Sequence, residues 1–73
     1  MKDGIYTNEH KKLIERIIKA RREAGLSQTE AAKRLGKSQS YISKIEVGQR
    51  KIDVIELKRL AKLYHKNFNF FLR

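Results

Sequence analysis

Residues 27–45 read SQTEAAKRLGKSQSYISKI and predict two short helices joined by a tight turn. Ser27 is followed three residues later by Glu30, which is the spacing of a capping box. In a capping box the hydroxyl and the carboxylate bind free amide groups at the start of a helix. The first of the two helices is therefore expected to begin at Gln28.

The turn and the second helix follow from Gly36. Glycine accepts the left-handed backbone that ends a helix without steric cost, and Ser38 can cap the next helix. Ile42 and Ile45 are the only aliphatic residues of that helix, and they lie three apart on one face. The side chains that point elsewhere are Gln39, Ser40, Ser43 and Lys44. One narrow apolar stripe therefore anchors the second helix and leaves a polar face outside.

This polar face offers an amide, hydroxyls and an ammonium group, which are the donors and acceptors that reach base edges in the major groove of DNA. Most polar helix faces are only solvated, so the face alone does not decide between solvation and recognition. The residues around it favour recognition.

The spacing around the turn resembles the helix-turn-helix of Cro and phage-repressor-type (Xre-like) regulators. Ala32 stands at the small-residue position of that motif, Gly36 at the turn glycine, and Ile42 and Ile45 at the two core aliphatics. Similar flanking residues extend the resemblance over roughly residues 10–72; they are Arg21, Gly25-Leu26-Ser27-Gln28, Glu46-Val47-Gly48 and Leu60-Ala61. The resemblance implies an all-α fold, a compact five-helix lambda-repressor-like domain whose helices 2 and 3 form the motif.

The charge of the chain favours a polyanionic partner. Of its 73 residues, 18 are Lys or Arg and 8 are acidic, which gives a net charge of +10. Such a field attracts nucleic acid or an anionic membrane without regard to sequence. A membrane-bound amphipathic helix, however, does not require an alanine pair, a turn glycine and capped helices. We therefore expect double-stranded DNA as the partner, with no membrane and no small-molecule ligand.

Several other classes of protein are disfavoured. Cysteine is absent, and His10 and His65 have no partners at metal-ligand spacing, so no metal or other cofactor is expected. The sequence has neither an apolar run near the ~20 residues of a membrane span nor a signal-peptide hydrophobic region, which predicts a cytoplasmic protein. Without paired carboxylates in a pocket-sized fold or a phosphate-binding glycine loop, an enzyme is not expected and no catalytic residue is assigned.

Outside the motif, residues 1–7 are expected to form an N-terminal arm, and residues 8–73 the helix-turn-helix domain. The first helix should begin near Thr7 or Asn8 and end near Ala24. Its expected core stripe consists of Leu13, Ile14, Ile17, Ile18, Ala20 and Ala24. Asp53 and Glu56 form a second capping box for a helix that should end near His65, and Asn67 can cap a last short helix.

The candidate DNA contacts follow from the chemistry of the polar face and from the resemblance. Gln39 could bind adenine in a bidentate manner and Lys44 could donate to guanine, while Ser40 and Ser43 could read or support either base. Residues expected to contact phosphates are Gln28, Ser38, Tyr41, Gln49, Arg50 and Lys51. For Tyr41, core packing and a thymine-methyl contact are equally open, and the loop after the second motif helix could be an ordinary basic loop. The resemblance also implies a structural salt bridge between Arg21 and Glu46.

The C-terminal segment carries three phenylalanines in four residues, at positions 68, 70 and 71, which is more than one helical face can bury. In similar proteins the positions of Phe68, Phe71 and Leu72 close the core, whereas that of Phe70 is commonly polar. We therefore expect a homodimer interface that includes Phe70 and Phe71. A loosely packed chain end is the alternative.

Together these features predict a sequence-specific transcriptional regulator that represses by occupying an inverted-repeat operator. Two alternatives share the fold: the antitoxin of a toxin-antitoxin pair, and the controller protein of a restriction-modification operon. The neighbouring genes would separate these possibilities better than any residue of the chain.

Overall fold

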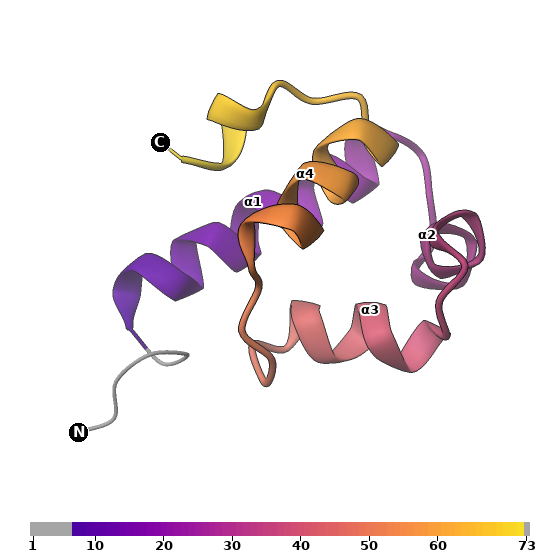
Figure 1. Ribbon diagram of the computed structural model, residues 1–73, viewed down its shortest axis with the longest axis horizontal. Helices are drawn as coiled ribbons and strands as arrows, with labels where there is room; N and C mark the ends of the chain where they lie inside the picture. Colours follow the sequence, from indigo (N-terminus) through magenta and orange to yellow (C-terminus); the bar gives the residue numbers. More distant parts are fainter. Residues whose placement is uncertain (1–6, 73) are drawn as a thin grey trace.

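The computed structural model describes residues 7–72 and shows an all-helical protein without strands in this range (Figure 1). Its elements are α1 (Asn8–Glu23), α2 (Gln28–Leu35), α3 (Gln39–Glu46), α4 (Val54–Leu63) and the 3-10 helix η2 (Phe68–Phe71). The all-α prediction is confirmed. The count of five helices is not, because the last segment is a four-residue 3-10 helix. The predicted N-terminal arm, apart from Thr7, lies outside the described residues.

Capping side chains set the start of each element. The N-cap residues are Thr7, Ser27, Ser38, Asp53 and Asn67. Both predicted capping boxes are present. In the first, the Ser27 hydroxyl accepts from the Glu30 amide at 3.0 Å, and the Ser27 amide donates to the Glu30 carboxylate at 2.9 Å. Because these bonds join residues three apart, they are predictable from the local sequence.

Each α helix ends just before a residue with left-handed backbone. The φ angle is 75° at Gly25, 71° at Gly36, 81° at Gly48 and 59° at His65. After Gly36 the Lys37 amide donates to the Ala32 carbonyl at 2.9 Å, which satisfies the last turn of α2. Gly36 therefore ends α2 as predicted, whereas α4 stops at Leu63, slightly before the predicted end near His65.

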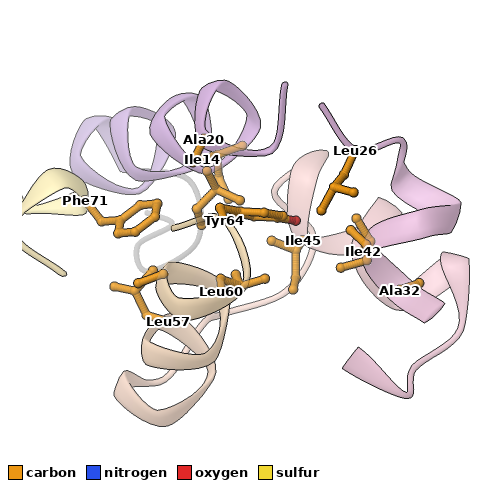
Figure 2. Packing of buried hydrophobic residues seen from close by; sticks show 13 residues of the cluster. Ile14, Ala20, Leu26, Ala32, Ile42, Ile45, Leu57, Leu60, Tyr64 and Phe71 are labelled. Atoms are coloured by element: carbon orange, nitrogen blue, oxygen red, sulfur yellow. The ribbon is translucent and has the colours of Figure 1, made fainter. Parts of the chain in front are cut away.

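The core lies where α1, α3 and α4 meet, around the ring of Tyr64 (Figure 2). Its largest fully buried side chains are Tyr64, Ile17, Ile42, Ile45 and Leu60. In α2, Ala31 and Ala32 are 0% and 1% exposed, and these small side chains let α3 pack closely against α2. Of the predicted α1 stripe, Ile14, Ile17 and Ala20 are buried, and the other members are partly buried against them.

The C-terminal segment differs from the expectation. Leu72 is 60% exposed, so the prediction that it closes the core is wrong. The other two residues expected there do contribute: Phe68 is partly buried against the core, and Phe71 is 2% exposed, with its ring directed toward the space between α1 and α4 (Figure 2). The short 3-10 helix turns one aromatic ring inward and leaves the following side chain outside.

No helix among residues 7–72 is both long enough and apolar enough to cross a membrane. In Figure 1, α3 lies along one side of the molecule, and η2 lies on the opposite side of α1 and α4. The two features that the sequence singled out, the polar helix and the aromatic C-terminal segment, are thus far apart.

Candidate nucleic-acid interface

The two faces of α3 are separated as the sequence predicted. Ile42 and Ile45 are each 1% exposed and anchor the helix in the core. On the other side, Gln39, Ser40 and Lys44 are exposed and Ser43 is half-buried. In Figure 1, α3 runs along the edge of the molecule, which leaves the helix face opposite the two isoleucines toward solvent.

Gln39, at the start of α3, is held by a partner on α2. Its Nε2 donates to Gln28 Oε1 at 2.8 Å, and Gln28 Nε2 donates in turn to Glu46 Oε1 at 2.9 Å. A bidentate contact to adenine needs one N–H and one carbonyl oxygen. The contact to Gln28 uses only one of the two N–H groups of the Gln39 amide, so the arrangement is chemically compatible with adenine recognition.

Arg21 and Glu46 form a bidentate ion pair between α1 and the end of α3. Arg21 Nε lies 2.7 Å from Glu46 Oε2, and Nη2 donates to Oε1 at 3.0 Å. A third nitrogen, Nη1, donates to the Leu26 carbonyl at 2.8 Å. The two side chains are 11% and 4% exposed, and the hydrogen bond to Glu46 raises the pKa of Arg21. This pair and the two glutamines connect α1, α2 and α3.

A second cluster joins α3 to α4, and we call Lys37, Tyr41, Arg50 and Glu56 the Tyr41 cluster. The Tyr41 hydroxyl donates to Glu56 Oε2 at 3.0 Å, and the Arg50 guanidinium donates to the same oxygen. The Arg50 guanidinium carbon lies 4.9 Å from the centre of the Tyr41 ring, and Lys37 Nζ lies 5.2 Å from it. Cations at these distances are attracted by the electron-rich face of the ring.

The contacts of this cluster shift two pKa values in opposite directions. Burial, with help from the hydrogen bond to Glu56, raises the pKa of Tyr41. Burial also tends to raise the pKa of Glu56, but hydrogen bonds from Arg50, the Asp53 amide and Tyr41 outweigh it and hold the pKa below its usual value. Glu56 is therefore an anion at neutral pH and balances part of the positive charge beside α3.

The predicted phosphate contacts divide into two groups. Ser38, Gln49, Arg50 and Lys51 are exposed. Gln28 and Tyr41 are half-buried and already hydrogen-bonded within the protein. All of these DNA contacts, to bases and to phosphates, stay predictions.

Sequence reasoning gave no site role to Lys37 and gave Glu56 only a capping role. Lys37 directly follows the turn glycine, and a basic residue at this place beside the start of α3 is a signal for a site role. The contact between Glu56 and Tyr41 joins residues 15 positions apart, and no local pattern indicates it.

The residues expected at a dimer interface are not both on the surface. Phe71 is 2% exposed, so its ring has little area to offer a second copy. Phe70 is half-buried and packs edge-on against Phe71, with ring centres 5.2 Å apart. The adjacent exposed apolar side chain is Leu72.

Comparison with known proteins adds one finding. A family model described as helix-turn-helix matches residues 17–71, which contain the C-terminal part of α1 and all of the later elements. The matched range includes both hydrogen-bonded clusters around α3. A search of curated proteins gives no match.

Proposed function

Because the chain belongs to the Cro/C1-type helix-turn-helix (Xre-like) family, whose members are DNA-binding regulators, we propose that it is a sequence-specific transcriptional repressor. It binds an inverted-repeat operator in double-stranded DNA as a homodimer, and α3 enters the major groove. The observation that carries this proposal is the division of α3 into a buried isoleucine stripe and an exposed polar face.

Recognition of bases is assigned to the exposed face of α3. Gln39 binds adenine through its amide, and Lys44 donates to guanine, with Ser40 and Ser43 in support. The hydrogen bond from Gln39 to Gln28 supports this assignment, because a side chain held in place before binding loses less entropy when it meets the base.

Phosphate contacts on both sides of α3 fix the protein on the duplex. Gln28 and Ser38 provide them before the helix, and Gln49, Arg50 and Lys51 provide them after it. Tyr41 joins this set from the first turn of α3. The net charge of +10 supports the assignment, since neutralising DNA phosphates releases counterions and drives association.

Dimerisation is assigned to the C-terminal segment, with Phe70 and Leu72 at the surface and Phe71 supporting the Phe70 ring from inside. The exposed Leu72 beside the half-buried Phe70 supports this choice. A two-fold dimer on DNA places its recognition helices about 34 Å apart, one turn of the duplex, and therefore requires an inverted repeat.

Selection of bound sequences from random duplex DNA, followed by footprinting, tests the proposal. We expect one enriched inverted repeat with half-sites about one turn apart. A duplex affinity that is the same for selected and random sequences would overturn the sequence-specific regulator. An enriched site without two-fold symmetry would retain sequence recognition and overturn the dimer.

A further inference from the structure

Glu56 makes more contacts than its place at the start of α4 requires. Its Oε1 accepts from the Asp53 amide at 3.2 Å, and the Glu56 amide donates to Asp53 Oδ1 at 2.7 Å. These two bonds complete the capping box. The other oxygen, Oε2, is turned to a different set of donors, which are the Tyr41 hydroxyl at 3.0 Å and the Arg50 guanidinium.

The donors around Glu56 Oε2 are those that bind a phosphate oxygen. A guanidinium and a phenol hydroxyl both donate to an anionic oxygen here, and protein contacts to DNA phosphates use the same groups. The carboxylate is largely shielded, with its side chain 17% exposed, whereas the Arg50 side chain is 42% exposed and can be reached from solvent. When a DNA phosphate approaches Arg50, the guanidinium is therefore already bound to the Glu56 carboxylate.

We propose that Glu56 is an internal competitor of DNA phosphate, which occupies Arg50 and Tyr41 in the free protein and lowers affinity for every duplex. This inference rests on the proposed function. It assigns to Glu56 a restraining role in DNA binding that the capping box does not explain. When DNA binds, Arg50 exchanges the Glu56 carboxylate for a phosphate oxygen while staying beside the Tyr41 ring.

Whether Glu56 strengthens or weakens DNA binding depends on the free energy that its contacts with Arg50 and Tyr41 save or cost when DNA binds. Holding Arg50 against Tyr41 saves some side-chain entropy, but a glutamine carbonyl at position 56 can still accept from the tyrosine hydroxyl. The negative charge adds a cost of its own, because its ion pair with Arg50 must be broken before the guanidinium can bind a phosphate. Removing only the charge should therefore strengthen binding.

Glu56→Gln makes this change with little effect on shape, since glutamine also serves at this position of a capping box. A matched control exists in the same molecule. Glu30 occupies the equivalent position in the capping box of α2, where its carboxylate accepts from the Ser27 amide at 2.9 Å. Glu30→Gln removes the same charge and likewise keeps a capping residue.

The affinity of each variant for a short random-sequence duplex would be measured by fluorescence anisotropy at several salt concentrations. We expect Glu56→Gln to bind roughly threefold to fivefold more tightly than Glu30→Gln, because a partly exposed ion pair no longer has to be broken. In an Arg50→Ala background the advantage of Glu56→Gln over Glu30→Gln should disappear.

Two outcomes would overturn the proposal. Equal affinities for the two glutamine variants would mean that only net charge matters, and an advantage that persists in the Arg50→Ala background would mean that Glu56 does not act through Arg50. If the wild-type protein bound no duplex at all, the proposed function itself would fail, and the two failures are therefore distinguishable.

Carbon NMR on the wild-type protein provides a readout that needs no variant. The carboxyl resonance of Glu56 should move when random duplex is added, because the carboxylate loses Arg50, whereas that of Glu30 should move much less. A Glu56 resonance that stays in place while the protein is saturated with duplex would contradict the exchange.

Discussion

At the scale of single residues, the orientation of the exposed Gln39 side chain is fixed by hydrogen bonds to side chains beneath it. Its amide is tied to Gln28, and Gln28 donates to the buried carboxylate of Glu46. Glu46 is in turn held by Arg21 from α1. The orientation of an exposed side chain on α3 therefore depends on a largely buried ion pair.

Substituting Gln39→Ala should remove about 1 to 3 kcal/mol of binding to the selected operator and relax the base preference at one position. Binding to random duplex should change little, because this contact carries sequence information only. Arg50→Ala serves as the contrast, since loss of a phosphate contact weakens all sequences alike and flattens the salt dependence. Equal losses on operator and random duplex for both variants would contradict these roles.

Tyr64 lies at the centre of the core at 2% exposed, and its hydroxyl has no hydrogen-bond partner within residues 7–72. Burial raises its pKa from 10.0 to about 12. The neutral phenol is thus favoured in the folded state, and its contribution to stability is present below pH 10 and lost as the pH rises through about 12.

Tyr64→Phe keeps the ring and removes the unpaired hydroxyl. Near neutral pH we expect the free energy of unfolding to stay unchanged or to rise by roughly 1 kcal/mol. Above pH 10 the wild type should lose stability faster than the variant, because only its unfolded state gains from releasing the phenol proton. Urea unfolding at both pH values measures this, and a large loss at neutral pH would show that the hydroxyl has a partner.

At the scale of elements, the end of α4 differs from the other three helix ends in the type of its left-handed residue. Three α helices are followed by glycine in the left-handed conformation, and α4 is followed there by His65 with a φ of 59°. After α4 the Lys66 amide donates to the Ala61 carbonyl at 2.9 Å, so the hydrogen bonding of the helix end is complete. In this conformation the Cβ atom of His65 lies close to a backbone carbonyl oxygen, which costs free energy.

His65→Gly should therefore raise the free energy of unfolding by about 0.5 to 1 kcal/mol, the relief of strain less the added freedom of the unfolded chain. His65→Ala is the control, since alanine keeps the Cβ atom and should give no gain. Thermal or urea unfolding compares the two. Equal stabilities for the glycine and alanine variants would refute strain at this position.

The ion pair between α1 and α3 can be tested by a double-mutant cycle. Arg21→Ala and Glu46→Ala should each lower the free energy of unfolding by roughly 3 kcal/mol, because each leaves a largely buried charge without its partner. The double variant should be no less stable than either single variant. Two small losses that simply add would show that the pair contributes little.

At the scale of the whole molecule, acid is expected to destabilise the fold. The Lys66 hydrogen bond lowers the pKa of Glu23, the hydrogen bond with the Ser27 backbone lowers that of Glu30, and the contacts of Glu56 lower its pKa despite burial. Groups with lowered pKa values stabilise the folded state above their unfolded value, which is 4.5 for these glutamates. That stability is lost as the pH falls through the folded pKa values.

The free energy of unfolding should accordingly be level above about pH 5 and fall below it at constant ionic strength. Protonation also removes negative charge from a chain that already carries +10, which increases repulsion within the folded state. Urea unfolding across this pH range checks the expectation. Stability that remained level far below pH 4.5 would mean that these carboxylates do not contribute.

Local features of the sequence were enough to predict the start of each helix, the turn at Gly36 and the burial of Ile42 and Ile45. Capping bonds join residues three apart, and the spacing of apolar residues sets which face of a helix is buried, so neither depends on distant segments. These features predicted the helix-turn-helix and the polar face of α3, which carry the proposed function.

Contacts between distant segments could not be read in this way. Glu56 had the spacing of a capping residue, and its second oxygen meets Tyr41 only because α3 and α4 pack together. Phe71 and Leu72 are adjacent and both apolar, yet one is buried and the other is 60% exposed. Which of them enters the core depends on the direction in which the short 3-10 helix leaves α4, and that direction is set by packing against α1.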